Sequence, residues 1–458
     1  VCDVSVVEVD ANALLCLRSD FVISSVPPVF VSLCRSSVMS LARSSSTLSP
    51  WTGVKLGPKD PIFGLMELYQ EDPDPKKLNL AVGAYRGEDG KPWILPVVRK
   101  VEADVVARST QMEYLPIIGS AKFLKEATKL AYGDDCNVIT QNRLAAIQTI
   151  SGTGALRVAF DFLARFLGNP LPSIYVPDPT YANHYPILKD SGFPETKKYR
   201  YIDKKTNSLD ESGLLQDLKD ATEGSLVLLH AVAHNPTGVD PTPEQWSKIS
   251  QVCKERKLLP IFDCAYLGFA SGDVDKDAIS VRKFVEDGHR IVLCQSFAKN
   301  FGLYGHRIGC LSFVTDSSEE KQRVESQLKI LARAQYSNPP LHGARIVEEI
   351  LGDPKLKAQW MKEVKMMADR INSARHALKS ELIKHGSERN WDHLTNQIGM
   401  FCYTGLNKDQ AHKLMKEWHI YITSSGRISM AGVNLQNAKY IAEGIHAVTQ
   451  SGAAKSKL

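Results

Sequence analysis

Short apolar runs alternate with helical patterns between residues 151 and 314, and this alternation restricts the possible folds more than any other feature. The runs cover residues 173–176, 226–229, 259–262, 291–294 and 308–313. Runs of this length between helices are typical of a parallel or mixed sheet with both faces covered. We therefore expect an α/β fold.

Two helices have clear start signals. Thr242, Pro243 and Gln245 predict a capping box for a helix that ends near residue 257. Asn434 is the expected N-cap of a last helix that ends near residue 450. Long charged helices are expected between these two, beyond residue 316.

Charge and apolar patterning disfavour two classes of partner. Lys and Arg number 56 against 51 Asp and Glu, which leaves a net charge of +5 with the signs interspersed. A nucleic-acid partner is therefore not expected. Every apolar run is far shorter than the roughly 20 residues that a membrane helix needs, so no membrane partner is expected either.

Cysteine and histidine usage favour neither disulfides nor a metal. The nine cysteines form no Cys-x-x-Cys pair, which is typical of a reducing compartment. His230 and His234 have the spacing of a zinc motif. On a strand they would lie about 13 Å apart, too far to share one ion, so we expect no metal site.

The two ends differ in composition from the rest. Residues 21–59 contain no acidic residue and are rich in Ser, so we interpret residues 1–49 as a targeting or upstream segment. Residues 451–458 read as a flexible tail that ends in Ser-Lys-Leu, a peroxisomal address. The peroxisome is the first expectation, and the mitochondrial matrix is the alternative.

The segment after the run at 291–294 is the strongest indication of chemistry. Lys299 follows a buried strand, where desolvation can remove its proton and make it a nucleophile toward an aldehyde. Ser296 and Arg307 flank it with a hydroxyl and a fork of donors suited to phosphate. An amine beside a phosphate clamp suggests pyridoxal phosphate.

A second phosphate contact is expected at residues 151–155. Ser151, Gly152 and Thr153 open an apolar helix, whose free amides and dipole attract an anion. The rival interpretation is a dinucleotide fingerprint and thus a nicotinamide-dependent oxidoreductase. It is disfavoured because Arg157 stands where the third glycine would be.

Polar residues follow two further runs, at the strand ends where α/β sheets bind ligands. Asp263 can pair with a protonated pyridine nitrogen, which keeps the ring able to accept electrons. Asn235 and Tyr266 can hydrogen-bond the ring hydroxyl.

Together these motifs resemble the class I aminotransferases, and most of all the aspartate aminotransferases in their mitochondrial form. Further similar segments lie at residues 79–86, 113–117, 337–345, 399–401 and 426–428, and the resemblance runs from about residue 51 to 450. It implies the type I pyridoxal-phosphate fold, with a mixed, mostly parallel seven-stranded sheet in a large domain and a smaller α+β domain. The expected bounds are 50–91 for the arm and first part of the small domain, 92–366 for the large domain and 367–450 for the rest.

The resemblance also implies the role of each site residue. Lys299 forms the Schiff base and carries the proton, while Asp263 binds the pyridine nitrogen. The other cofactor residues are Ser151, Gly152, Thr153, Tyr181, Asn235, Tyr266, Ser296 and Arg307, with Tyr114 from a partner subunit of a homodimer. The substrate residues are Gly83, Tyr181, Asn235 and Arg427, with Arg333 from the partner. Tyr181 stands where the family mostly has Trp.

The implied reaction is ping-pong transamination of small dicarboxylic amino and oxo acids, L-aspartate with 2-oxoglutarate. Two arginines suit it because each can hold one carboxylate bidentately. An aromatic-preferring member of the same class is the alternative. A non-catalytic binding protein is disfavoured because Lys299 and Asp263 are both present.

Overall fold

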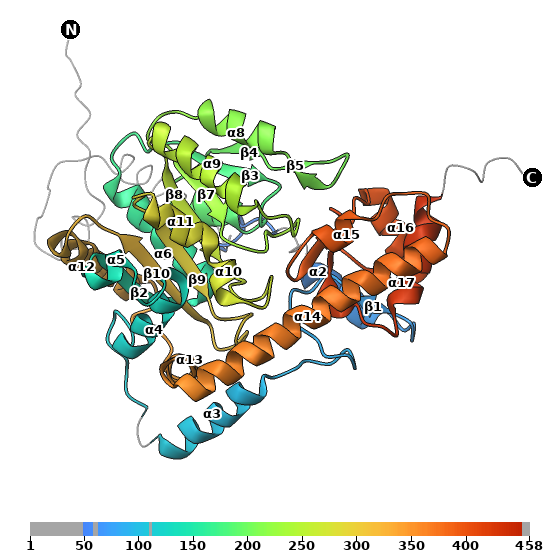
Figure 1. Cartoon of the computed structure of the whole chain (residues 1–458), viewed down its shortest axis with the longest axis horizontal. Helices are drawn as coiled ribbons and strands as arrows, with labels where there is room; N and C mark the ends of the chain where they lie inside the picture. The colour runs from blue at the N-terminus through green and yellow to red at the C-terminus, as the bar shows by residue number, and fades with distance from the viewer. Residues whose placement is uncertain (1–48, 58–62, 110–111, 451–458) are drawn as a thin grey trace, which may run out of the picture. The chain divides into compact units, whose positions relative to one another are not determined.

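The computed structural model describes residues 49–57, 63–109 and 112–450 (Figure 1). The chain divides into two units, residues 1–59 and 60–458, and everything below concerns the second. The expected targeting segment, apart from residue 49, and the tail of residues 451–458 lie outside the described residues. None of the described helices is long and apolar enough to cross a membrane.

A seven-stranded sheet forms the centre of this unit, and its strand order is β2-β10-β9-β8-β7-β3-β4. Only β10 runs against its neighbours β2 and β9, so the sheet is mixed and mostly parallel, as predicted. The strands are β2 (Leu144–Ile150), β3 (Ile174–Asp178), β4 (Thr196–Arg200), β7 (Leu226–His230), β8 (Leu259–Cys264), β9 (Val292–Ser296) and β10 (Ile308–Val314). Five of them coincide with the predicted apolar runs.

Both faces of the sheet are covered, because alternate residues of one strand enter two different apolar cores. Leu226 and Leu228 belong to the core beneath α6, whereas Val227 and Leu229 belong to the opposite core, which also contains residues of α4, α9, α11 and α13. The helices preceding residue 316 are α2 (Phe63–Glu71), α3 (Pro96–Arg108), α4 (Ala121–Tyr132), α5 (Asn137–Thr140), α6 (Ser151–Phe166), α7 (His184–Asp190), α8 (Glu211–Lys219), α9 (Pro243–Glu255), α10 (Val274–Asp277) and α11 (Ile279–Glu286).

The long helix α14 dominates the second half of the chain, as Figure 1 shows. The helices there are α12 (Ser318–Gln335), α13 (His342–Gly352), α14 (Pro354–Lys384), α15 (His393–Asn396), α16 (Lys408–Trp418), the 3-10 helix η2 (Met430–Gly432) and α17 (Ala438–Thr449). Three strand pairs complete the fold: parallel β1 (Leu78–Asn79) with β12 (Ile420–Tyr421), antiparallel β11 (Phe401–Tyr403) with β13 (Arg427–Ser429), and antiparallel β5 (Ile202–Asp203) with β6 (Ser208–Leu209). The expected domain bounds stay a prediction.

One helix start was predicted correctly and one was wrong. The capping box of α9 forms, with the Gln245 amide donating to Thr242 Oγ1 at 3.3 Å and the Thr242 amide donating to Gln245 Oε1 at 2.8 Å. The last helix, however, begins at Ala438 with Asn437 at its N-cap. Asn434 instead caps the preceding turn, where its Oδ1 accepts the amides of residues 436 and 437.

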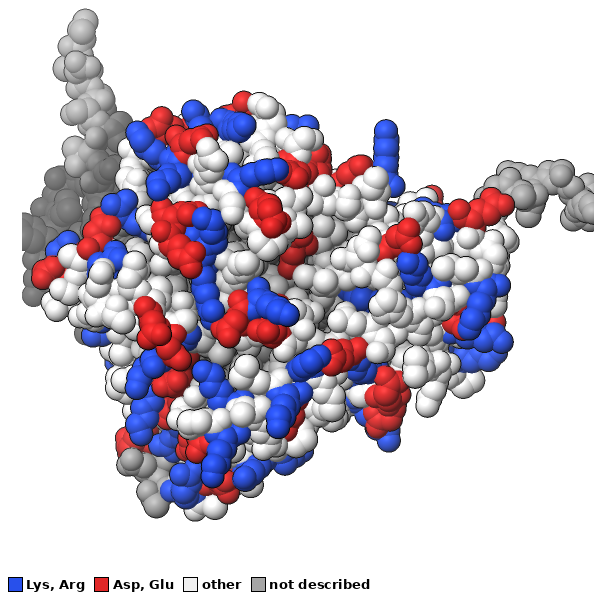
Figure 2. Space-filling view, in the orientation of Figure 1, with Lys and Arg blue, Asp and Glu red and all other residues white. Residues whose placement is uncertain are grey.

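Positive and negative side chains alternate over the face that Figure 2 shows, without a continuous basic stripe on that face. This distribution agrees with the interspersed charges of the sequence.

Candidate active site

The predicted site residues gather at the carboxyl ends of the adjacent strands β7, β8 and β9. In the ladder, His230 at the end of β7 pairs with Asp263, and Asp263 pairs with Cys294. Asn235 and Lys299 follow β7 and β9 in the next loops. Three strands therefore deliver three of the predicted residues to one edge of the sheet.

Lys299 is a partly buried amine. Its Nζ lies 5.4 Å from the centroid of the Tyr266 ring. Burial lowers the pKa of Lys299, Arg307 lowers it further and Asp263 opposes them. A lowered pKa increases the fraction of neutral amine, which is the form that attacks a carbonyl.

Asp263 is a buried carboxylate held by a histidine. Its Oδ2 lies 3.0 Å from His184 Nε2. Burial raises the pKa of Asp263, but the hydrogen bond with His184 and the electrostatic effects of His184, His230 and Lys299 together outweigh burial, so the pKa stays below its ordinary value. The group is therefore ionised at neutral pH and suited to a protonated ring nitrogen.

A chain of hydrogen-bonded side chains continues from Asp263 through His184, and it was not predicted from the sequence. His184 Nδ1 lies 2.8 Å from Thr180 Oγ1, and the same hydroxyl lies 3.0 Å from His230 Nε2. Burial lowers the pKa of His230 to about 3, so this ring stays neutral. Tyr181 packs edge-on against His184 with ring centroids 5.4 Å apart. The sequence signal for this group was the clustering of Thr180, Tyr181 and His184 in one short segment.

The expected distance between His230 and His234 was wrong. Their ring centroids lie 4.1 Å apart. The strand ends at His230 and the chain then turns, with Ala233 at a φ of 52°. His234 stacks on the Tyr201 ring instead of extending the strand.

The predicted phosphate contacts meet at the first turn of α6. Ser151 has a φ of 59°, and its hydroxyl lies 3.0 Å from that of Ser296. The N-cap residue, Ile150, supplies no side-chain hydrogen bond, so no side chain caps the first amides of α6. Thr153 is exposed on the same turn. Arg307 follows a tight turn, and its Nη1 donates to the Tyr304 carbonyl at 3.0 Å.

Two glycines permit this close packing. A Cβ on Gly152 would lie 3.0 Å from the Ser296 Cβ, and one on Gly309 would lie 2.5 Å from the Ser151 carbonyl. An uncapped helix start with two hydroxyls and an arginine has the donors that a phosphate group needs. With the amine of Lys299 and the carboxylate of Asp263 nearby, the residues fit pyridoxal phosphate.

Arg427 forms a second anion site on β13. It is only 4% exposed. Its Nη1 donates to Asn235 Oδ1 at 3.2 Å, and its Nη2 donates to the Ala81 carbonyl at 2.6 Å. Within the described part of the chain, its buried Nε has no hydrogen-bond partner. A buried cation in this state is suited to a carboxylate ligand.

Phe401 and Gly83 shape the space around Arg427. The guanidinium lies 4.1 Å from the centroid of the Phe401 ring. A Cβ on Gly83 would lie 2.9 Å from the same ring, so a larger residue there would require the ring to shift. Tyr266 packs edge-on against Phe401 with centroids 5.9 Å apart, which connects the substrate side with the cofactor side.

Two predicted residues do not join this cluster. Tyr114 is 86% exposed. Arg333 is exposed on α12, where its guanidinium contacts the Ser337 hydroxyl. Their roles in a shared site stay predictions.

Comparison with known proteins agrees with this geometry. The family described as "Aminotransferase class I and II" matches residues 75–445. The mitochondrial aspartate aminotransferases of Dictyostelium discoideum and Arabidopsis thaliana are 53% and 54% identical over 406 residues, which is 89% of this chain and 95% and 94% of theirs.

Solved structures share the fold. An aromatic-amino-acid aminotransferase from Burkholderia pseudomallei, covalently bound to pyridoxal phosphate, has a TM-score of 0.85 at 41% identity and covers 88% of this chain and 100% of its own. A mitochondrial aspartate aminotransferase from Trypanosoma brucei has a TM-score of 0.82 at 44% identity, covering 84% and 100%. The predicted type I fold is confirmed. The chain therefore belongs to the class I and II aminotransferase family.

Proposed function

We propose that this chain is an aspartate aminotransferase that converts L-aspartate and 2-oxoglutarate into oxaloacetate and L-glutamate. The observation that carries transamination of amino acids is the buried Arg427, whose Nε lacks a partner among the described residues, in one site with Lys299 and Asp263. The preference for a dicarboxylic substrate rests on the role proposed below for Arg333. The names of the curated mitochondrial relatives support the same activity.

Pyridoxal phosphate, when bound, supplies an aldehyde carbon for the amino group and a ring that takes up electrons from the substrate α-carbon. Lys299 Nζ removes the proton from that carbon and later returns it. Asp263 holds the proton of the ring nitrogen. Tyr266 and Asn235 hydrogen-bond the ring oxygen, and burial raises the pKa of Tyr266 so that its hydroxyl stays a donor.

The substrate is held by its two carboxylates. Arg427 binds the α-carboxylate, helped by Asn235 and the backbone at Gly83. We propose that Arg333 of a second copy binds the distal carboxylate and that Tyr114 of that copy binds the phosphate group. The exposure of both side chains supports a homodimer with shared sites.

An aromatic-preferring activity is the second candidate, because the Burkholderia pseudomallei neighbour is an aromatic-amino-acid aminotransferase. Catalytic efficiency on L-aspartate and on L-phenylalanine separates the two. We expect aspartate to be preferred by at least about 100-fold, because its distal carboxylate can pair with Arg333 of the second copy, whereas phenylalanine has no second carboxylate. Equal efficiency on the two amino acids would refute the dicarboxylate proposal.

For the compartment, we propose delivery to the peroxisome through residues 456–458, with the mitochondrial matrix as the alternative. The acid-poor leader and the mitochondrial relatives support the alternative. A fluorescent tag inserted between the leader and Trp51, in chains with and without residues 456–458, decides between them. Mitochondrial fluorescence that is unchanged by the deletion would overturn the peroxisomal proposal.

A further inference from the structure

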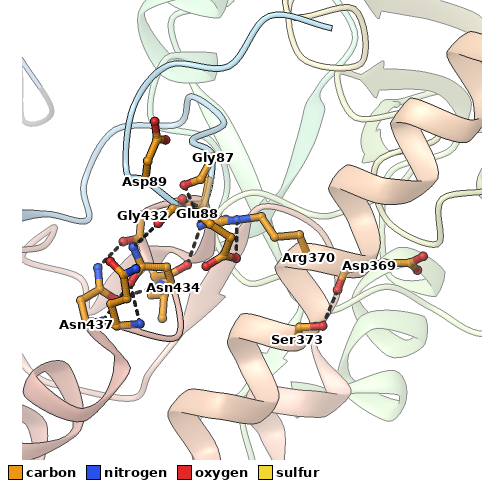
Figure 3. Close-up of polar contacts among 12 residues, drawn as sticks. Gly87, Glu88, Asp89, Asp369, Arg370, Ser373, Gly432, Asn434 and Asn437 are labelled. Atoms are coloured by element: carbon orange, nitrogen blue, oxygen red, sulfur yellow. Dashed lines mark hydrogen bonds and ion pairs between the residues drawn. The ribbon is translucent and has the colours of Figure 1, made fainter. Parts of the chain in front are cut away.

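Arg370, on α14, binds two chain segments at once, as Figure 3 shows. Its side chain is 10% exposed. Its Nη1 donates to the Ala431 carbonyl at 3.1 Å, and its Nη2 donates to the carbonyls of Val433 at 3.0 Å and Gly87 at 3.3 Å. These carbonyls come from two segments about 350 residues apart in the sequence.

The same two segments carry the α-carboxylate site. Residues 80–88 include Gly83, and residues 427–434 begin with Arg427. Close to the site, Arg427 Nη2 contacts the Ala81 carbonyl, and the Ser429 amide donates to the Leu80 carbonyl at 2.7 Å.

At their far ends, the two segments are joined by side-chain hydrogen bonds. Asn434 Nδ2 donates to the Glu88 carbonyl at 3.0 Å, and Arg370 contacts Gly87 and Val433 next to it. Next to the contact of Ser429 with Leu80 the backbones are closely packed, since a Cβ on Gly432 would lie 3.0 Å from the Asn79 carbonyl oxygen. Arg370 therefore closes the end of the pair that the backbone bonds do not reach.

The chemistry of this position requires an arginine. Three carbonyls in different directions match the planar fork of a guanidinium, whereas an ammonium is a single compact charge. Glu88 lies 3.1 Å from Arg370 Nε, but its side chain is 53% exposed, so this ion pair contributes little. The hydrogen bonds to the carbonyls are the main interaction.

We propose that Arg370 is a positioning residue that sets the distance between Gly83 and Arg427 and so determines affinity for the substrate α-carboxylate. This inference rests on the proposed function. It predicts a defect in substrate binding that is common to all amino acids, because every amino acid has an α-carboxylate. Cofactor binding should be unaffected, because the cofactor residues lie on other segments.

The test compares Arg370→Gln, Arg370→Lys and Glu88→Gln with Lys365→Gln. The control Lys365 is on the same helix, and its ammonium forms an exposed ion pair with Asp369. For each holoenzyme, KM and kcat are measured with L-aspartate and with L-phenylalanine, together with the dissociation constant of pyridoxal phosphate. Calorimetry measures the binding of succinate, which has no amino group to transfer.

We expect Arg370→Gln to raise both KM values and the succinate dissociation constant by about 10-fold or more, as for the loss of charged hydrogen bonds. Arg370→Lys should recover part of the loss. Glu88→Gln and the control should stay within about 3-fold of wild type. In all variants cofactor affinity should also stay within that range.

Unchanged substrate and succinate affinity in Arg370→Gln would overturn the inference. A defect confined to aspartate would also overturn it, as would an equal loss of cofactor affinity, which indicates general damage to the fold. If wild type binds succinate but transaminates neither amino acid, the proposed function fails, and the succinate constants still decide the role of Arg370.

Discussion

Gly309→Ala should disrupt the contact between the sheet and the first turn of α6. Gly309 lies in the interior strand β10, paired with Thr149 on one side and Ser296 on the other. An added Cβ would lie 2.5 Å from the carbonyl carbon and oxygen of Ser151 and 2.8 Å from the Gln295 carbonyl oxygen. Carbon atoms in contact normally lie about 3.5–4.0 Å apart, so Ser151 must move by about 1 Å.

The expected cost is about 1–3 kcal/mol of unfolding free energy, which is the usual range for overpacking. We expect the upper part of this range, because all three obstructing atoms belong to the backbone and cannot rotate away. Moving Ser151 also shifts the amides that face the phosphate. Affinity for pyridoxal phosphate should therefore fall by about 10-fold, which corresponds to about 1.4 kcal/mol.

Urea unfolding of the apoenzyme and fluorescence titration with pyridoxal phosphate measure the two effects. Gly305→Ala is the matched control, because a Cβ there meets nothing within 4 Å. If Gly309→Ala matches the control in both stability and cofactor affinity, the close approach of β10 and α6 is not what orders the phosphate site.

Three further predictions test other parts of the site. Lys299→Ala should retain cofactor but lose nearly all turnover. In the wild-type enzyme, borohydride should attach the cofactor to the peptide that contains Lys299. A label on another lysine would contradict the assignment. Arg333→Leu should lower kcat/KM for aspartate by about 100-fold or more and for phenylalanine far less; equal losses would make Arg333 structural. Burial raises the pKa of Asp240 from 3.8 to about 7, so the protonated carboxyl stabilises the fold below pH 3.8 and this contribution is lost as the pH rises through about 7. Asp240→Asn should therefore make the unfolding free energy, measured with urea, fall less steeply between about pH 4 and pH 8. The same pH dependence in variant and wild type would refute this prediction.

The sheet and its strand-end residues could be predicted because the responsible patterns are local. Each apolar run carries its own signal, and a parallel sheet brings the carboxyl ends of its strands to one edge. Lys299, Asp263 and Asn235 were therefore placed correctly at that edge.

The missed features depend on how the chain turns after a strand. The contact between His230 and His234 arises because Ala233 adopts a positive φ, which the residue pattern does not predict. Asn434 has the residue type of an N-cap, but three intervening residues form a turn first. Similarly, the contacts of Arg370 could not be predicted, because the two segments that it binds are distant in the sequence and meet only in the folded chain.

The absorption spectrum of the purified protein shows directly whether bound pyridoxal phosphate takes the amino group of aspartate. We expect a visible band from bound pyridoxal phosphate that disappears when L-aspartate is added and returns with 2-oxoglutarate, because transamination moves the amino group onto the cofactor and off again. A protein without a visible band, or with a band that L-aspartate leaves unchanged, would contradict the account.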